Sequence, residues 1–299
     1  MSFNFSAFGL ISGAMFTFLI FVSSQEPATT HTKANTNLPQ QIHSAIENKT
    51  YTFAGEAMPD NFDNRERLNR ELSVNAYWQS NTLLNIKKAN RYFPLMERIL
   101  AEEGVPDDFK YLAVAESDLR NATSHANAKG FWQFRTGAGK EMGLEINDEV
   151  DERYHVERAT RAAAKYLKIL RKRFGNWTNA AAAYNVGQGN FNSSRKKQQE
   201  FSFFNMNMNI ETNRYLFRLI AIKEIMSSPE SFGYYIQPNE LYPPLDDFYE
   251  VVVDSSVSNW SDFAKEKGIT YRMLKVYNPW LIDNKLTVKK NTYQIKVPR

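Results

Sequence analysis

Residues 104–117 read GVPDDFKYLAVAES, and this stretch predicts a short amphipathic helix that ends in a glutamate and a serine. Pro106 suits the first turn of a helix, and the two aspartates after it suit the positive end of the helix dipole. Phe109, Leu112 and Glu116 recur at helical spacing and therefore fall on one face. Because that face is the apolar one, Glu116 is expected to lie partly buried near the helix C-terminus.

The expected position of Glu116 would change its protonation. Burial disfavours the charged form of a carboxyl, and the negative end of a helix dipole acts in the same direction. Both effects raise the pKa, and a carboxyl that keeps its proton near neutral pH can act as a general acid. The alternative is a structural glutamate that reaches solvent or pairs with Arg120, four residues further on. Spacing alone favours that alternative, so the surrounding sequence has to decide.

Helical patterns dominate residues 64–226, which we expect to form one mainly α domain. Arg158–Phe174 has an apolar stripe and is followed by Gly175, a common residue at a helix end. Trp177–Asn185 contains four consecutive alanines, which allow another helix to approach closely. Glu211–Met226 is the last helix of this part.

Two polar turns interrupt these helices. Residues 117–135 form a loop rich in serine, asparagine and threonine, which closes with Gly-Phe-Trp-Gln-Phe-Arg. Tyr184 and Asn185 come at a helix end, directly before a Val-Gly pair that predicts a tight turn. Each turn could place hydrogen-bonding groups and aromatic rings beside Glu116. Either one alone is more often a core tyrosine, an asparagine cap or an ordinary loop.

The last part of the chain has a different pattern. Residues 227–247 carry four prolines and read as a connector. Residues 248–299 begin and end with β-branched and aromatic runs, and two helical patterns lie between them. This order predicts a small α+β module of the form βααβ. The expected elements are Tyr249–Val253, Trp260–Lys267, Tyr271–Tyr277 and Tyr293–Val297.

The N-terminus predicts export. Phe8–Val22 is apolar and uncharged, is short for a membrane span, and precedes small residues. We expect residues 1–24 to be a signal peptide or an uncleaved N-terminal membrane anchor, with a buried core helix as the less favoured alternative. Residues 25–63 are polar and are expected to be a linker. The protein would then act in the periplasm or cell envelope, in association with the membrane if the anchor stays.

The composition excludes several classes of protein. The 299 residues include no cysteine, which rules out disulfide scaffolds, thiolate metal sites and cysteine nucleophiles. The four histidines are scattered, so neither a metal nor another cofactor is expected. A net charge of +4 and a pI near 9.0 suit an anionic polymer but are too weak to indicate nucleic acid. Arg153, Arg158 and Arg161 are expected to form a solvated face, with anionic substrate groups as the alternative partner.

Several motifs occur together in a specific order. Glu116-Ser117 is followed by Ser124, by Gly-Phe-Trp-Gln at 130–133, by Ala-Tyr-Asn-Val-Gly at 183–187 and by Glu-Thr-Asn-Arg-Tyr at 211–215. This series resembles the family 1 lytic transglycosylases, and among them the membrane-bound D-type members, whose catalytic domain precedes LysM modules. The resemblance implies a goose-lysozyme-like helical fold for residues 64–226.

The resemblance also implies an enzyme, a peptidoglycan lyase. Such an enzyme cuts the β-1,4 bond between N-acetylmuramic acid and N-acetylglucosamine and leaves a 1,6-anhydro-muramoyl end. Glu116 would first protonate the leaving oxygen and then, as an anion, take the proton of the sugar's C6 hydroxyl. The N-acetyl group of the substrate would support the positive centre in between, so a single carboxyl would replace the usual pair.

The resemblance assigns further residues around the catalytic Glu116. Six would bind the glycan strand or line its path: Ser117, Ser124, Gln133, Tyr184, Asn185 and Tyr215, the last as a hydrogen-bond partner that sets the state of the acid. Asn127 departs from the family pattern, in which glycine is common, although asparagine tolerates a left-handed backbone. Whether Asp118 serves as a second carboxylate stays open at this point.

Residues 248–299 resemble a single LysM-like module. The likeness lies in Asn259–Thr270, Leu274–Trp280 and Ile295–Pro298. Ser255–Trp260 stands where a LysM module usually has Gly-Asp-Thr-Leu, in the loop that contacts N-acetylglucosamine chains. Glycan binding by this module is therefore an open expectation.

Two other functions stay open. A muramidase of the same fold would use water in place of the C6 hydroxyl, and the geometry of the cleft decides between the two reactions. A non-catalytic wall-binding protein is the other alternative, and the intact Glu116 argues against it.

Overall fold

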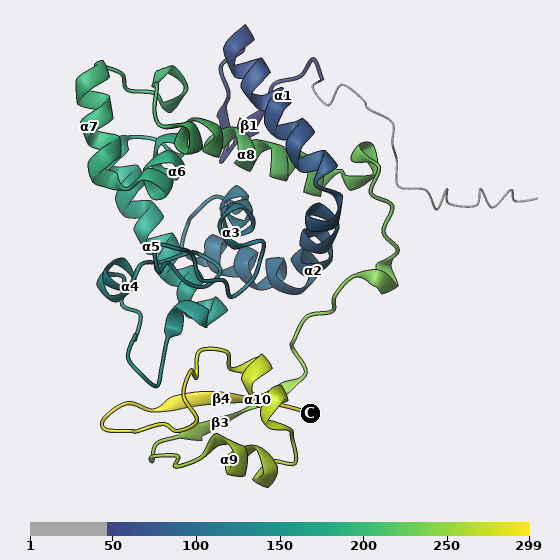
Figure 1. The fold of residues 1–299 in the computed structure, drawn as a ribbon, viewed down its shortest axis with the longest axis vertical. Helices are drawn as coiled ribbons and strands as arrows, with labels where there is room; N and C mark the ends of the chain where they lie inside the picture. The colour runs from purple at the N-terminus through teal and green to yellow at the C-terminus, as the bar shows by residue number, and fades with distance from the viewer. Residues whose placement is uncertain (1–46) are drawn as a thin grey trace, which may run out of the picture. The chain divides into compact units, whose positions relative to one another are not determined.

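The computed structural model describes residues 47–299, and the mainly α architecture predicted from the sequence is confirmed (Figure 1). The predicted signal peptide or anchor at 1–24 and the first part of the predicted linker lie outside the described residues. Within residues 47–299, no helix combines the length and the apolar character that crossing a bilayer would take.

The first part of the described chain, up to Ser227, is built mainly of α-helices that differ in length. They are α1 (Phe62–Tyr77), α2 (Gln79–Glu102), α3 (Lys110–Ser117), α4 (Thr136–Glu141), α5 (Val156–Phe174), α6 (Trp177–Val186), α7 (Gln188–Gln198) and α8 (Ile210–Ser227). The short helix α3 contacts both α2 and α8, and it lies among the longer helices in Figure 1. Its Leu112 and Ala113 have no exposed surface, so α3 is a central element of the core.

The alanine-rich helix α6 packs against α5 and α8. Its four alanines at 180–183 are fully buried, as expected for a close helix contact. Asn176 caps the helix, because its side chain accepts a hydrogen bond from the Asn179 amide at 2.8 Å. The helix stops at Gly187, which has a φ of 84° that favours glycine. Tyr184 is thereby fixed in the last turn of α6.

The folded chain begins earlier than the sequence predicted, because residues 51–58 are not linker. They contain a short antiparallel hairpin of β1 (Thr52–Phe53) and β2 (Glu56–Ala57). Phe53 is fully buried and packs edge-on against Phe109, with ring centroids 5.2 Å apart. The Ala54 amide donates to the Asp108 carboxylate at 2.7 Å. A strand of two residues is too short to show alternating apolar and polar residues, so the sequence did not reveal this hairpin. The linker therefore ends earlier in the chain than the predicted residue 63.

The proline-rich segment 227–247 is held against α2. It contains two 3₁₀ turns, Pro229–Phe232 and Pro238–Glu240. Arg91 of α2 donates to the backbone oxygen of Pro243 at 2.9 Å, and Tyr242 donates its amide to the Lys87 carbonyl at 3.1 Å. The segment predicted as a connector therefore has fixed contacts with the helical part.

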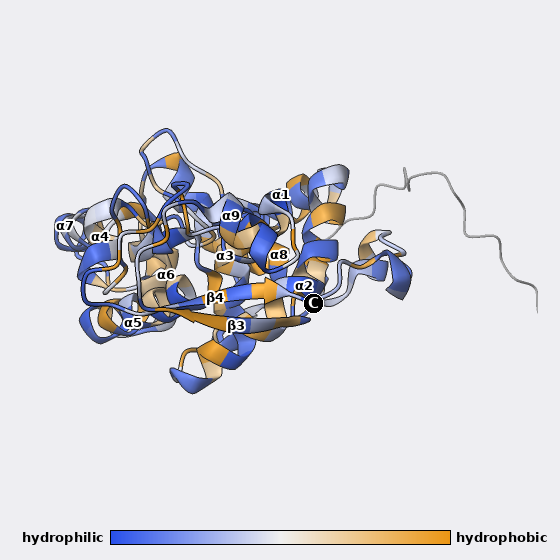
Figure 2. Ribbon diagram, turned by 90° about the horizontal axis from the view of Figure 1, so that it is seen from below, coloured by the Kyte–Doolittle hydropathy of each residue, from blue (hydrophilic) through white to orange (hydrophobic). Residues whose placement is uncertain are grey.

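Residues 248–299 form the predicted strand–helix–helix–strand module. The order is β3 (Phe248–Val253), α9 (Trp260–Glu266), α10 (Tyr271–Tyr277) and β4 (Tyr293–Pro298). β3 pairs antiparallel with β4 along its whole length, and Figure 2 shows β3 as largely hydrophobic. Trp260, Leu274 and Ile295 have no exposed surface and form the centre of the module's own core.

A segment of the helical part, residues 145–157, also packs against this module. Val150 is fully buried within the module's hydrophobic cluster. Asp151 donates its amide to the Trp280 carbonyl at 2.9 Å, and the His155 ring stacks on the Trp280 ring with centroids 5.6 Å apart. Arg153 of the same segment donates to the 117–135 loop, so the module and that loop share one support.

A charge at position 150 is expected to destabilise the protein. Val150→Asp would bury a carboxylate among apolar side chains, and an uncompensated buried charge costs about 3 kcal/mol or more. Val252→Asp is the matched control, because Val252 lies in β3 of the same module and is 63% exposed. The control should change the free energy of unfolding by about 0.5 kcal/mol or less. Denaturant unfolding measures both values, and equal effects would contradict the buried contact.

Candidate active site

Glu116 lies in the last turn of α3 and faces Tyr215 of α8. The Tyr215 hydroxyl donates a hydrogen bond to Oε1 of Glu116 at 2.5 Å. Glu116 is half-buried, whereas Tyr215 is fully enclosed. The alternative pairing of Glu116 with Arg120 was wrong, because Arg120 contacts Asp118 at 3.0 Å instead. The acid is therefore held by a phenol from a distant part of the sequence.

Burial raises the pKa of Glu116 to about 7. The hydrogen bond from Tyr215 stabilises the carboxylate and lowers the pKa, but desolvation is the larger effect. The negative charge of Glu211 raises the pKa, and the positive charge of Arg218 lowers it. A carboxyl with a pKa near neutrality is present in both protonation states, so it can give up a proton and take one back.

Two phenols near Glu116 stay protonated. Burial, together with the charge of Glu116, holds the pKa of Tyr184 and of Tyr215 well above the usual value of 10. Both hydroxyls are therefore hydrogen-bond donors. The Tyr184 hydroxyl donates to the backbone oxygen of Trp132 at 2.7 Å, which fixes the aromatic end of the 117–135 loop to α6.

Asn185 joins the end of α6 to the start of α8. Its Oδ1 accepts a hydrogen bond from the Thr212 hydroxyl at 2.9 Å, and its Nδ2 donates to Oε1 of Glu211 at 3.5 Å. The charge of Glu211 acts on Glu116, so Asn185 is linked to the acid through one intermediate residue. This contact joins the two helices that carry the predicted tyrosines.

Ser117 ties the 117–135 loop to α3. Its side chain is buried, and its hydroxyl lies 3.0 Å from the backbone oxygens of both Ala113 and Phe131. Gln133 braces the same loop, because its Nε2 donates to the backbone oxygen of Gly130 at 2.8 Å. The substrate-binding roles predicted for Ser117 and Gln133 stay predictions. In the structure both side chains form hydrogen bonds that position the loop.

Gly130 is the tightest point of this loop. Its φ is +80°, and an added Cβ would lie 1.9 Å from the backbone oxygen of Arg153. The buried Arg153 side chain pairs with Asp151 at 2.7 Å and donates to the backbone oxygen of Phe134 at 3.2 Å. The expectation of a solvated arginine face was therefore wrong for Arg153, which is a structural brace of the loop.

Ser124 lies on the exposed outer turn of the loop. Its Oγ accepts a hydrogen bond from the Ala128 amide at 3.0 Å. Asn127, in the same turn, has a φ of 60°, so the expectation that asparagine takes the left-handed position is confirmed. Ser124 therefore differs from Ser117 in presenting its side chain at the surface.

The Asp118 carboxylate is held by hydrogen bonds and is not a free second carboxylate. Its Oδ1 accepts hydrogen bonds from Asn81 at 2.8 Å and from Asn85 at 3.2 Å, both on α2. Sequence reasoning missed these asparagines and Arg218, and it quoted Glu211 only as part of the 211–215 motif. Glu211 and Arg218 both act on the pKa of Glu116. Helix α2 precedes the recognised motifs, and no local pattern marked its polar residues as part of the site.

No group of three or more histidine, aspartate or glutamate side chains in residues 47–299 is arranged to hold a metal ion. The candidate site is built from one carboxyl, two phenols and amide groups. These groups can transfer protons and form hydrogen bonds with a neutral, hydroxyl-rich substrate.

The mainly α fold places one candidate acid in the site, the glutamic acid at the end of α3. Comparison with known families adds to this description. Residues 95–207 match the family model of the transglycosylase SLT domain, and residues 249–299 match that of the soluble lytic transglycosylase C-terminal LysM-like domain. The chain thus contains a segment similar to the transglycosylase SLT domain, followed by a segment similar to the LysM-like domain of soluble lytic transglycosylases.

One curated relative is similar to part of the chain. The "Putative tributyltin chloride resistance protein" of Alteromonas sp. (strain M-1) is 34% identical over 113 residues, which cover 36% of this chain and 55% of that protein. The match thus spans about half the length of the relative. Membership of the membrane-bound D type stays a prediction, since the C-terminal match is to soluble lytic transglycosylases. Tyr215 lies beyond the SLT match, so its assignment rests on its bond to Glu116.

Tyr215→Phe is expected to lower kcat/KM by about tenfold, the usual effect of losing a hydrogen bond to a charged group. The lost bond stabilises the carboxylate, so the pKa of Glu116 should rise further and the alkaline fall in activity should move to higher pH. Activity measured from pH 5 to 9 tests this. Tyr111→Phe is the control, because Tyr111 is also buried but contacts Ser227. A variant with an unmoved pH profile would show that Tyr215 does not act on the acid.

Proposed function

We propose that this chain is a peptidoglycan lytic transglycosylase. It cuts the β-1,4 bond between N-acetylmuramic acid and N-acetylglucosamine and leaves a 1,6-anhydro-muramoyl end. The observation that carries the proposal is the half-buried Glu116, with a pKa of about 7 and a 2.5 Å hydrogen bond from Tyr215. Such a group can serve in both protonation states at one pH.

In the first step, protonated Glu116 gives its proton to the glycosidic oxygen. The bond from that oxygen to C1 of the muramoyl residue breaks, and N-acetylglucosamine leaves with a hydroxyl group. The positive charge at C1 is supported by the substrate's own N-acetyl group, so no second protein carboxylate is required. Glu116 is left as an anion, which the Tyr215 hydroxyl stabilises.

In the second step, the anion of Glu116 takes the proton of the C6 hydroxyl of the same muramoyl residue. The C6 oxygen then bonds to C1 and closes the 1,6-anhydro ring. Glu116 regains its proton, and no water is consumed. The high pKa of Glu116 keeps the proton available for the first step. The hydrogen bond from the Tyr215 hydroxyl stabilises the carboxylate that the second step requires.

Other assignments form part of the proposal. Ser124, on the exposed turn, would contact the N-acetyl group of the sugar, and Tyr184 and Asn185 would line the cleft beside the acid. The catalytic domain would end at residue 226, and residues 248–299 would add affinity for the glycan strand. Residues 1–24 would direct the enzyme to the periplasm or cell envelope.

Mass analysis of the fragments that the purified protein releases from peptidoglycan tests this function. We expect products that are one water lighter than those of a muramidase. Products with reducing muramic ends would reassign the protein as a hydrolase of the same fold. Binding to the sacculus without any released fragment would overturn the enzymatic function and leave a wall-binding protein.

A further inference from the structure

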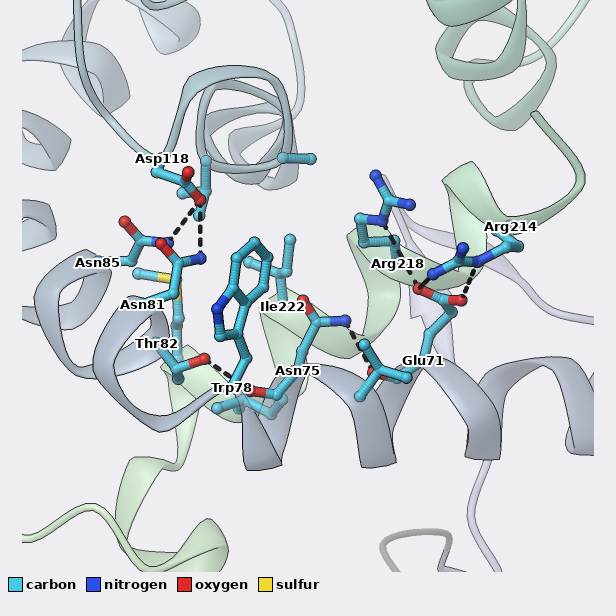
Figure 3. Close-up of a pocket in the computed structure, with 15 residues that line it drawn as sticks. Glu71, Asn75, Trp78, Asn81, Thr82, Asn85, Asp118, Arg214, Arg218 and Ile222 are labelled. Carbon is cyan, nitrogen blue, oxygen red and sulfur yellow. Dashed lines mark hydrogen bonds and ion pairs between the residues drawn. The ribbon is translucent and has the colours of Figure 1, made fainter. Parts of the chain in front are cut away.

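A pocket of about 300 Å³ lies next to the acid and has no role in the proposed reaction. It is enclosed by residues of α1, α2, α3 and α8, and Ala115, the neighbour of Glu116, belongs to its wall. Figure 3 shows Asp118 at one end, Arg214 and Arg218 at the other, and Trp78 between them. The volume is at the lower end of the range for small-molecule pockets, which is about 300–1,000 Å³.

The arginine end of the pocket carries an excess of positive charge. Glu71 is 1% exposed and pairs with Arg214 at 2.6 Å, with Arg218 at 3.6 Å and with Arg70 at 2.5 Å. One buried carboxylate thus faces three guanidinium groups and cannot neutralise them. Arg214 and Arg218 line the pocket and are 30% and 25% exposed, so part of each guanidinium group remains accessible to an anion.

The other end of the pocket is polar but has its charge balanced. Asp118 accepts hydrogen bonds from Asn81 and Asn85, and Arg120 lies 3.0 Å from its second oxygen. The Lys88 ammonium group donates to the Asp118 backbone oxygen at 2.8 Å. The charged residues of the lining itself are two carboxylates and two guanidinium groups. Beside them, three further cations (Arg70, Lys88 and Arg120) outnumber the two nearby acids (Glu116 and Glu211), so the surroundings are positive on balance, which favours an anionic ligand.

Trp78 supplies the apolar surface of the pocket. It stands at the junction of α1 and α2 and is 56% exposed. The face of its ring lines the pocket and can pack against an aliphatic chain. Ile222 of α8 also lines the pocket. The preferred ligand therefore combines a carboxylate with an aliphatic segment.

We propose that this pocket binds a carboxylate of the peptide stem that branches from the glycan strand. The inference rests on the proposed function, which places muramoyl residues at Glu116. Glycan chains owe their recognition to hydroxyl and N-acetyl groups, whereas the peptide stems of peptidoglycan carry free carboxylates on short aliphatic residues. Arg214 and Arg218 bind the carboxylate, and Trp78 packs against the chain that bears it. The enzyme thereby prefers strands that still carry peptides.

The test compares two substrates, peptide-bearing glycan strands and the same strands after an amidase has removed the peptides. The measured quantity is the ratio of kcat/KM on the first substrate to kcat/KM on the second. Arg214→Gln is expected to lower this ratio at least tenfold. Arg70→Gln is the matched control, because Arg70 pairs with the same Glu71 but does not line the pocket, and it should keep the wild-type ratio.

A second variant guards against misfolding of the first. Trp78→Ala removes an exposed side chain, so it should fold normally and should also lower the ratio. A wild-type ratio in both variants, or an equal loss in Arg70→Gln, would overturn the pocket assignment. Cleavage of neither substrate by the wild type would instead refute the proposed function itself. A binding measurement tests the pocket without turnover. The wild type is expected to bind the amidase-released peptide at equilibrium, and Arg214→Gln is expected to bind it more weakly.

Discussion

Glu116→Gln is expected to reduce the release of fragments from peptidoglycan by about a thousandfold or more. General acid–base catalysis by one group contributes about 10²–10⁴-fold, and here the same carboxyl would act in both proton transfers. Glutamine keeps the size of the side chain and can still accept the hydrogen bond from Tyr215. It has no proton to give to the leaving oxygen. Activity within tenfold of the wild type would contradict the catalytic assignment.

The same substitution has an expected effect on stability that separates loss of chemistry from loss of fold. The pKa of Glu116 is raised from 4.5 to about 7 by burial. A raised carboxyl pKa means that the contribution of this group to stability is fully present below pH 4.5 and is lost as the pH rises through about 7. Glutamine cannot ionise, so Glu116→Gln should be more stable than the wild type at pH 8, by about 2–3 kcal/mol. Denaturant unfolding at pH 4 and pH 8 measures the difference.

Gly130→Ala is expected to cost about 3 kcal/mol or more of folding stability and most of the activity. The new Cβ would meet the backbone oxygen of Arg153 at 1.9 Å, and a φ of +80° disfavours alanine. The loop would have to move, and with it Trp132, which accepts the hydrogen bond from Tyr184. Thermal or denaturant unfolding, together with the rate of fragment release, measures both effects.

Gly137→Ala provides the control for this substitution. Gly137 lies in α4, nothing stands within 4 Å of its added Cβ, and its backbone is not left-handed. Alanine there should leave the protein unchanged or stabilise it by up to about 1 kcal/mol. Similar losses in the two variants would mean that the close approach of Gly130 to Arg153 is not the cause.

Local patterns predicted the features that depend on neighbouring residues. Helical spacing placed Glu116 on a buried stripe, and the structure gives that position the raised pKa expected from burial. The turn after Tyr184 and the order of elements in the C-terminal module were also readable, because turn residues and apolar periodicity mark them. The motif at 211–215 marked Tyr215, although only the fold shows that its hydroxyl reaches the acid.

Features that depend on distant contacts were not readable. No local pattern indicates that the Arg153 side chain is buried and donates to the backbone of a loop about twenty residues earlier. The prediction that this arginine is solvated was therefore wrong. The hairpin at 51–58 is too short to show a period, yet its Phe53 completes the core. The pocket beside Glu116 joins two segments that lie far apart in the sequence. The segment around Trp78 carries no recognised motif, and Arg214 lies in the 211–215 motif without being marked as a pocket residue.

A titration of the Glu116 carboxyl by carbon-13 NMR tests directly whether this residue can act as both acid and base. The resonance is assigned by its absence from Glu116→Gln. We predict a midpoint of about 7 in the free wild-type protein, since burial outweighs the hydrogen bond from Tyr215. A midpoint near the ordinary value of 4.5 would mean that Glu116 is ionised at neutral pH, and would contradict its role as the proton donor.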